Sequence, residues 1–301
     1  MLLKHKHLIV RAEIHHPPRN PSAMDNWMRQ LVQDIRMKVL MGPFSVYSDM
    51  PGNQGLTSVT IIETSHIAVH AWDEVFPALM EMDVYSCAEF DPQLIFDRLQ
   101  SDFGLAKLEW KFIDREHGLD EIPLSQPMLS PCPIYSKQLP ERFTLTKEFL
   151  MEQNLSTLNN WPAYHNLDDE QDAQDHFIVR DGVSCAGAHL IVDIWGADQL
   201  DDLELMERAM REAVETAKAT LLHIHLHHFT PNGGISGVAV LAESHISVHT
   251  WPERQFAAFD IFMCGDAKPE LAVEVLRTHF QPGQFQVQEL LRGRTGSYGD
   301  I

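Results

Sequence analysis

The sequence has little cysteine. Its 301 residues include only Cys87, Cys132, Cys185 and Cys264, and no two of these form a CxxC pair. Four widely spaced cysteines are too few for a disulfide scaffold, and their spacing does not match a structural zinc site. We therefore expect reduced thiols, no structural metal and a cytoplasmic protein.

Long apolar runs are also lacking. No run reaches the roughly 20 residues that a membrane-spanning helix needs, so we expect no membrane partner. The first residues, MLLKHKHLIV, combine some charge with a short apolar run. They lack the long apolar core and the small-residue cleavage site of a signal peptide. We expect this stretch to stay in the fold as a strand.

Basic residues are scarce. Lys and Arg number 23 against 43 Asp and Glu, which gives a net charge of −20. Neutralising phosphates requires a basic surface, so nucleic acid is not the expected partner. An acidic surface favours a small cationic substrate, although many acidic proteins are simply soluble. With 44% apolar and 22% charged residues, the chain has the composition of a globular protein that is long enough for two domains.

An internal repeat organises the chain. Three segments recur in the same order, at offsets of 182, 179 and 177 residues. They are HLIV at 7–10 and 189–192, SHIAVHAW at 65–72 with SHISVHTW at 244–251, and the Pro, Leu, Leu, Phe positions 92, 94, 99, 103 with 269, 271, 276, 280. We interpret the chain as a tandem duplication, with units at 1–118 and 184–301 and a linker at 119–183.

Each unit has the pattern of an α+β fold. In the second unit we expect strands at 188–195, 220–229, 237–242, 245–250, 257–263 and 285–291, and helices at 200–217 and from Pro269 onward. Hairpin-like neighbours indicate a mainly antiparallel sheet with its helices on one face. Two such sheets would pack against each other as an α/β/β/α sandwich. The linker is rich in proline at its start and acidic at its end, and its function cannot be read.

The densest group of reactive side chains lies between residues 234 and 264. The stretch GISGVAVLAESHISVHTWPERQFAAFDIFMCG contains Ser236, Ser244, His249, Glu253 and Cys264. It resembles the signature region of the bacterial and archaeal S-adenosylmethionine decarboxylases, with the cleavage-site serine, the following histidine and the cysteine at that family's spacing. The resemblance covers nearly all of 187–296 and, more weakly, 1–118.

This resemblance implies a proenzyme that cuts itself between Glu243 and Ser244. Ser244 attacks the Glu243 carbonyl, and elimination and hydrolysis convert it into a covalent pyruvoyl group. A serine hydroxyl is a weak nucleophile and needs a base, and an oxyanion must be stabilised. The resemblance assigns His249, as processing base, and Ser236 to this step.

The resemblance also implies the catalytic roles. The pyruvoyl group forms a Schiff base with the α-amine of S-adenosylmethionine and accepts the electrons released as carbon dioxide leaves. Cys264 is the proton donor, Glu253 holds the ribose, and Phe229 stacks on the adenine or the sulfonium. The product is the aminopropyl donor of spermidine and polyamine synthesis.

Strand geometry adds a hypothesis about how the copies cooperate. Ser244 and His249 are five residues apart on one strand, and odd separations place side chains on opposite faces. We therefore expect Ser244 and Cys264 to work with His70 and Glu74. The reciprocal set is Ser65 and Cys87 with Ser236, His249 and Glu253. One chain would then be a pseudo-dimeric monomer, although a homo-oligomer stays open.

The first copy departs from the signature. Thr64 stands where Glu243 does, Thr57 replaces Ser236, and Cys87 lies two residues farther from its serine. Ser65, His70 and Glu74 remain. These departures favour a supporting role for the first copy, and self-cleavage at Ser65 stays open.

Other functions remain possible at this point. The fold and pyruvoyl group would also suit a decarboxylase of arginine or ornithine, although Glu253 and Phe229 favour a nucleoside-bearing substrate. A non-catalytic regulatory or binding homologue is a third possibility, which the intact Glu243-Ser244 and Cys264 oppose. The alternating His223, His225 and His227 would suit zinc, but a polar strand face is the simpler interpretation.

Overall fold

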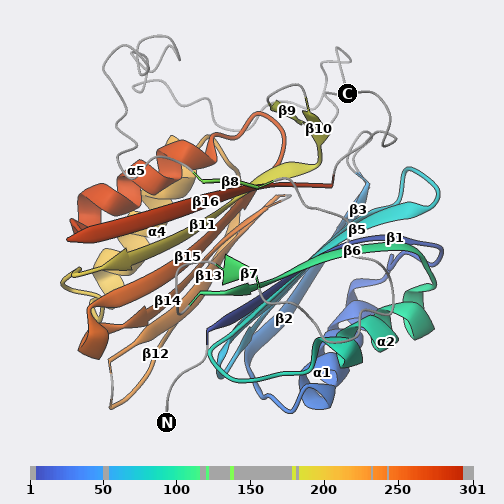
Figure 1. Cartoon of the computed structure of the whole chain (residues 1–301), viewed down its shortest axis with the longest axis horizontal. Helices are drawn as coiled ribbons and strands as arrows, with labels where there is room; N and C mark the ends of the chain where they lie inside the picture. The colour runs from blue at the N-terminus through green and yellow to red at the C-terminus, as the bar shows by residue number, and fades with distance from the viewer. Residues whose placement is uncertain are drawn as a thin grey trace.

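Two antiparallel seven-stranded sheets form the body of the protein. The computed structural model describes residues 5–49, 54–115, 120–121, 136–138, 178–180, 183–231, 233–242 and 244–293. Each sheet belongs mainly to one copy of the repeat, and the two sheets face each other across the middle of the molecule (Figure 1).

The first unit follows the order strand, helix, four strands, helix, strand. Its elements are β1 (Lys6–Ile14), α1 (Pro21–Asp34), β2 (Val39–Ser48), β3 (Gly55–Ile62), β4 (Ser65–Trp72), β5 (Ala78–Ser86), α2 (Pro92–Phe103) and β6 (Leu105–Asp114). The strand expected near the beginning of the chain is therefore present as β1.

The second unit repeats this order. Its elements are β11 (Gly187–Trp195), α4 (Leu203–Thr216), β12 (Leu221–His228), β13 (Ile235–Leu241), β14 (His245–Trp251), a 3₁₀ turn (Pro252–Arg254), β15 (Phe256–Met263), α5 (Pro269–Phe280) and β16 (Gln284–Arg292). The expected strands all occur with bounds shifted by one or two residues, and the first helix begins three residues later than expected.

The two sheets have the same topology. The strand order is β2-β3-β4-β5-β1-β6 in the first and β12-β13-β14-β15-β11-β16 in the second. Each is extended by a short linker strand, β7 (Asp120–Glu121) and β8 (Ser136–Gln138) respectively. Two further short strands, β9 (Ile178–Arg180) and β10 (Val183–Cys185), pair with each other. The sequence did not predict these linker strands, and most of 119–183 lies outside the described residues.

Local capping signals set the helix starts. Asn20 caps α1 by accepting a hydrogen bond from the backbone of Ala23, and Asp91 caps α2 through Gln93. A proline follows each of these caps, at the position where its missing N–H costs nothing. Asp202 caps α4 in the same way, although no proline follows it.

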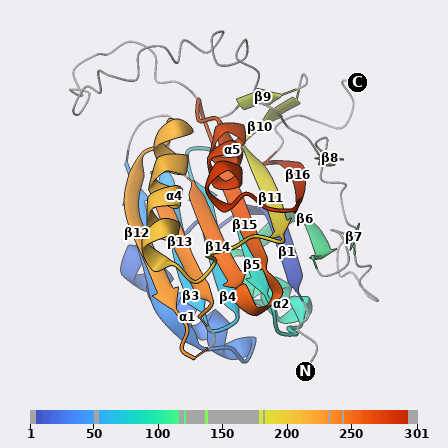
Figure 2. The ribbon, with the colours of Figure 1, turned by 90° about the vertical axis from the view of Figure 1, so that its left-hand side faces the viewer.

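Three apolar layers hold the sandwich together. One large cluster lies between the first sheet and α1 and α2, and a second lies between the other sheet and α4 and α5. Smaller clusters join the sheets, for example Ile9 and Ile113 with Ile191 and Leu290. Figure 2 shows α4 and α5 on one outer face and α1 and α2 on the opposite one. The expected α/β/β/α sandwich is confirmed.

Both faces of each sheet are therefore covered. All eight residues of β4 are buried, as are all of β5 and β15. This explains why the polar side chains of SHIAVHAW lie in the interior, between the sheets. Buried polar groups need partners, so the interface between the copies is where the structure must satisfy them.

Two buried arginines cross this interface reciprocally. Arg115 of the first unit contacts Asp193 at 2.6 Å and Asp260 at 2.8 Å in the second. Arg292 of the second unit contacts Glu81 at 2.8 Å and Asp83 at 2.5 Å in the first. Because each arginine pairs with carboxylates of the other copy, these ion pairs fix how the two sheets pack against each other.

Replacing Arg292 by methionine is expected to lower the free energy of unfolding by about 3–5 kcal/mol, because two buried carboxylates lose their partner. Urea denaturation measures the change. The matched control is Lys38→Met, which removes an exposed ion pair with Glu63 at 3.4 Å and should cost about 1 kcal/mol or less. Equal small effects of both changes would show that the arginine pairs do not hold the copies together.

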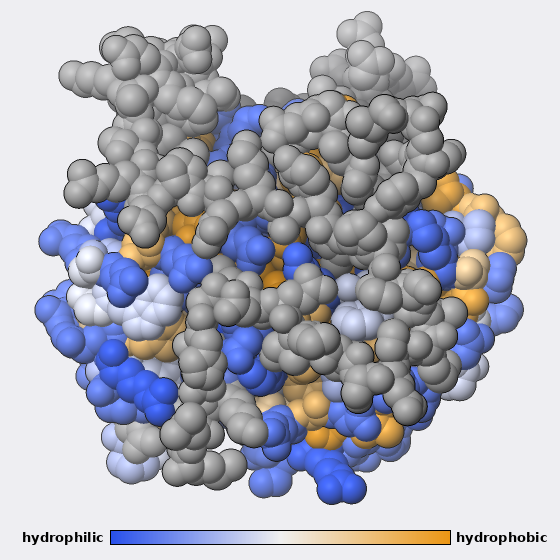
Figure 3. Space-filling model, viewed as in Figure 1, coloured by the Kyte–Doolittle hydropathy of each residue, from blue (hydrophilic) through white to orange (hydrophobic). Residues whose placement is uncertain are grey.

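The surface carries no extended apolar face in the view of Figure 3, where hydrophobic residues lie among hydrophilic ones wherever residues are coloured. None of the described helices has both the length and the apolar character required to cross a bilayer.

Candidate functional site

Two equivalent serines lie at the beginning of corresponding strands in the middle of the two sheets. Ser65 is the first residue of β4, and Ser244 directly precedes β14. Their exposed fractions are only 1% and 5%. Both lie at the interface between the copies, so each can meet side chains of the other sheet.

At Ser65 the partner is a histidine of the second copy. Ser65 Oγ lies 2.9 Å from Nε2 of His249. The other ring nitrogen of His249, Nδ1, lies 2.9 Å from Oγ of Ser236. Ser236 and His249 oppose each other on β13 and β14, so the sheet itself orients the imidazole. The result is a Ser65–His249–Ser236 chain of polar contacts that spans both copies.

The backbone around Ser65 is also organised. The N–H of Cys87 donates a 2.9 Å hydrogen bond to the carbonyl oxygen of Thr64. That carbonyl belongs to the Thr64–Ser65 peptide bond. The Thr64 hydroxyl in turn accepts a hydrogen bond from Ser86 at 3.1 Å. A donor thus already points at the carbonyl that Ser65 would attack.

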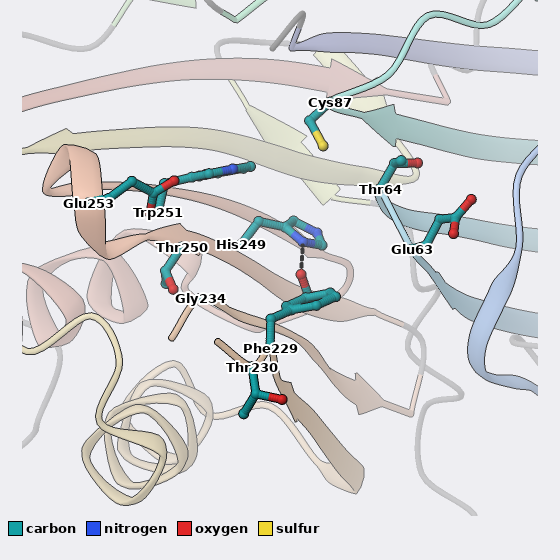
Figure 4. A pocket seen from close by; sticks show the side chains of 11 residues that line it. Glu63, Thr64, Cys87, Phe229, Thr230, Gly234, His249, Thr250, Trp251 and Glu253 are labelled. Atoms are coloured by element: carbon teal, nitrogen blue, oxygen red, sulfur yellow. Dashed lines mark hydrogen bonds between the residues drawn. The ribbon is translucent and has the colours of Figure 1, made fainter. Parts of the chain in front are cut away.

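A cavity of about 220 Å³ lies beside His249. Its walls come from both copies, as Figure 4 shows with Cys87, Thr64 and Glu63 on one side and Phe229, Trp251 and Glu253 on the other. The lining also includes Ser236 but neither Ser244 nor Cys264. A thiol, a carboxylate, an imidazole and an aromatic ring therefore converge on one space.

The environment of Ser244 differs. Ser244 Oγ accepts a hydrogen bond from the backbone N–H of Cys264 at 3.1 Å. His70 Nε2 lies 3.0 Å from Nδ1 of His245, the residue after Ser244, and His70 Nδ1 lies 3.0 Å from the Thr57 hydroxyl. Thr57 thus occupies the place of Ser236 and supplies the same group. Glu243 lies outside the described residues.

A small hollow lies beside His70. This hollow, lined by Thr57, His70, Trp72 and Ala242 among others, measures about 10 Å³. Cys264 packs in an apolar cluster with Trp72, Leu79 and Ala186. A Cβ on Gly187 would come within 3.0 Å of its sulfur. The segment leading into β11 therefore covers this thiol.

The predicted residues thus fall into two groups. Ser236, His249, Glu253 and Phe229, which the resemblance assigns to the same reaction as Ser244, gather around Ser65 and Cys87 instead. This is the reciprocal set that strand geometry predicted. For the other set, the structure places His70 against His245, while Glu74 is exposed in the β4–β5 connection.

The longer spacing between Ser65 and Cys87 does not change the position of the cysteine relative to the serine. Cys87 follows Ser86, which pairs with Ser65 across β4 and β5. Cys264 follows Met263 in the same way, one position beyond the pair of His245 with Phe262. The two extra residues lie in the connection, where Trp72 pairs with Leu79 but Trp251 pairs with Phe256. The longer spacing of Cys87 from Ser65 therefore reflects a longer connection, and Cys87 keeps a position equivalent to that of Cys264.

Burial keeps the histidines of both sites neutral. It lowers the pKa of His249 to about 3 and the pKa of His245 to about 4. It also holds the pKa of His66 and His70 well below the usual range. A neutral imidazole keeps one nitrogen available as an acceptor, so His249 is in the form that can take the proton of Ser65.

A row of buried histidines connects the two sites. The ring of His249 stacks on His66 at 5.2 Å, His66 lies 5.9 Å from His245, and His245 stacks on His70 at 5.3 Å. The SHIAVHAW and SHISVHTW repeats supply all four rings. His225, by contrast, lies on an outer strand and stacks on Phe44 of the first copy at 3.9 Å.

Sequence reasoning missed Arg115 and Arg292. The guanidinium of Arg115 lies 4.5 Å from the ring centre of Tyr85, whose ring lies 5.4 Å from His249. The signal was present, because the two arginines are related by the same offset of 177 residues as the repeated helices.

Comparison with known proteins follows the same division of the chain. Residues 9–116 and 188–293 match the family model described as S-adenosylmethionine decarboxylase. A "S-adenosylmethionine decarboxylase proenzyme" of Thermomicrobium roseum is 44% identical over 108 residues, which are 36% of this chain and 93% of that protein. A proenzyme of the same description from Methanococcus aeolicus is 44% identical over 110 residues, again 36% of this chain and 93% of that protein.

A solved structure, the adenosylmethionine decarboxylase of Aquifex aeolicus, is 32% identical to this chain. It covers 38% of this chain and 97% of its own, with a TM-score of 0.34. These proteins correspond in length to one unit of the duplication.

Proposed function

Because the chain belongs to the S-adenosylmethionine decarboxylase family, we propose that it decarboxylates S-adenosylmethionine with a pyruvoyl group made from its own backbone. The observation that carries the proposal is the pairing of buried serine and histidine across the copies, beside a cysteine and a cavity. The sequence signature assigns the cut to Glu243–Ser244, which would give fragments 1–243 and 244–301.

The residues around Ser244 suit such a cut. Its hydroxyl is buried and receives the N–H of Cys264, which fixes the position of Oγ. His70, neutral through burial, lies against the neighbouring His245 and is the proposed proton acceptor. The pyruvoyl group would supply an electron sink for the electron pair that stays on the substrate's α-carbon when carbon dioxide leaves.

The cavity suits the substrate's chemistry. S-adenosylmethionine carries a sulfonium cation, a ribose and an adenine. Phe229 offers a ring face for the cation or the base, and the Glu253 carboxylate can accept hydrogen bonds from ribose hydroxyls. Burial raises the pKa of the Cys87 thiol, so this thiol stays protonated at neutral pH and can donate a proton to a carbanion.

The test is a decarboxylation assay with carboxyl-labelled substrates. Wild-type protein is expected to release labelled carbon dioxide from S-adenosylmethionine and to lose this activity when hydroxylamine blocks its carbonyl group. Release of carbon dioxide from arginine or ornithine instead would show that the enzyme acts on a basic amino acid. No release from any of the three substrates would contradict the proposed activity and favour a binding function.

Replacing Glu253 by glutamine is expected to raise the KM for S-adenosylmethionine about 10-fold or more, because a charge-assisted hydrogen bond is worth about 1.5–3 kcal/mol. Self-cleavage should be unchanged. Steady-state kinetics and gel analysis separate the two effects. Glu74→Gln is the matched control, since Glu74 is the equivalent position in the first copy and does not line the cavity. An unchanged KM in the Glu253 variant would remove this residue from the substrate site.

A further inference from the structure

We infer that Ser65 is a second self-processing serine, cutting the chain at Thr64–Ser65, and that the cavity beside it is where substrate is decarboxylated. The inference rests on the proposed function and deepens it. It follows from four features of the Ser65 site: a base, a donor on the scissile carbonyl, a tolerated threonine and an open cavity.

The base is in contact with the nucleophile. Ser65 Oγ and His249 Nε2 are 2.9 Å apart, which is within the reach of a hydrogen bond between a nucleophile and its base. The ring is held from its other side by Ser236. His66 Nδ1 also approaches His249 Nε2, at 3.0 Å. Ser244, in contrast, has a backbone N–H on its Oγ where Ser65 has an imidazole.

The scissile carbonyl already has a stabilising donor. The Cys87 N–H contacts the Thr64 oxygen at 2.9 Å, where negative charge develops when Ser65 attacks. Ser65 also has a φ of 156°. Residues with a side chain rarely adopt such a φ, and this conformation costs backbone energy that cleavage releases.

The threonine before Ser65 does not prevent the reaction. The residue on this side of the bond contributes its carbonyl, which is identical in Thr64 and Glu243. The Thr64 side chain is turned to Ser86 and Met37, with hydrogen bonds of 3.1 and 3.2 Å. These contacts engage the Thr64 hydroxyl with residues other than Ser65.

Among the described residues, the larger cavity is lined by Thr64, which precedes Ser65, and by His249, which contacts Ser65. Space of about 220 Å³ is available beside His249, compared with about 10 Å³ beside His70. Cys87 lines the larger space together with Glu253 and Phe229. Cys264, its counterpart, is covered by Trp72 and Ala186. A keto group formed at residue 65 would thus meet a proton donor and substrate-binding groups.

The proposed reaction balances with one water. Ser65 Oγ–H gives its proton to His249 as Oγ bonds to the Thr64 carbonyl carbon, and the C–N bond then breaks as the nitrogen takes that proton. Loss of the Ser65 α-proton expels the Thr64 carboxylate and leaves an aminoacrylate. Its imine tautomer is hydrolysed by water to the ketone, releasing ammonia. No electrons enter or leave.

The experiment compares three proteins by denaturing mass spectrometry and by carbon dioxide release. Wild type is expected to contain fragment 1–64. Ser65→Ala should lose this fragment and more than about 1000-fold in kcat/KM, as removal of a reacting group does. Ser244→Ala should keep fragment 1–64 while it loses the cut at Glu243–Ser244, which shows that the two cuts are independent. Far-ultraviolet circular dichroism checks that both variants fold.

Two results would overturn the inference. One is a wild-type protein without a cut at Thr64–Ser65, which needs no variant to establish. The other is a folded Ser65→Ala protein with wild-type turnover. If either occurs while wild type is cut at Ser244 and releases carbon dioxide, the proposed function stands without the inference. If wild type is neither cut nor active, both fail.

Discussion

Alanine at His249 is expected to stop cleavage at Thr64–Ser65 and to leave the cut at Glu243–Ser244, whereas alanine at His70 is expected to do the reverse. His249 contacts Ser65 of the other copy at 2.9 Å. Its own strand directs it away from Ser244, five residues earlier. His70 meets His245, beside Ser244. Loss of a general base slows a proton transfer by about 100- to 10,000-fold.

Time courses of cleavage after synthesis in a cell-free system measure this crossed pattern. Fragments 1–64 and 244–301 report the two cuts separately. His223→Ala is the control, since His223 is an exposed histidine of the second unit and should affect neither cut. If His249→Ala blocks the cut at Ser244 and His70→Ala does not, each serine is served by its own copy and the crossed assignment is wrong.

Acidification from pH 7 to pH 5 is expected to destabilise the fold strongly. Burial lowers the pKa of His245 to about 4 and of His249 to about 3. In the unfolded chain these rings bind protons below about pH 6.5, but in the folded protein they do so only near pH 4 or 3. Between these limits the unfolded state binds more protons, so stability falls as pH falls.

The size of the effect follows from the same linkage. At pH 5, one ring whose pKa in the folded protein is near 4 lowers the free energy of unfolding by about 2 kcal/mol relative to pH 7. His5 behaves like His245, because burial lowers its pKa to about 4, and burial also lowers the pKa of His66 and His70. Glu81 acts in the opposite direction, because burial raises its pKa to about 7, and offsets roughly one histidine.

Urea denaturation at several pH values tests this prediction. The midpoint should fall steeply between pH 6.5 and pH 4.5, and a His245→Gln variant should show a shallower fall, because one titrating ring is gone. A midpoint that stays constant over this range would mean that the histidines between the sheets are protonated in the folded protein.

Much of the fold was predictable because its signals are local. Alternating and continuous apolar runs, proline at helix starts and asparagine or aspartate caps set the elements to within a few residues. The repeat then predicted two equivalent sheets. The short strands β7 and β8 were missed because two or three residues carry no periodicity, and only pairing with a sheet edge makes them strands.

The signature named the candidate site residues, and only the strand geometry indicated how they are grouped. The signature named Ser236, Ser244, His249 and Cys264, but a linear motif does not say which copy each side chain faces. The period of the strand gave the correct hint for His249. The cavity beside Thr64 and His249 and the covering of Cys264 depend on how the two sheets pack, which involves contacts between residues more than 100 positions apart.

The central claim is that the chain converts a serine of its own backbone into a keto group. Mass spectrometry of the denatured wild-type protein tests it most directly. The account predicts a fragment 244–301 whose mass is lower by one ammonia than that of the same peptide with an N-terminal serine. A single uncut chain of 301 residues, or a cut fragment that retains its serine, would contradict it.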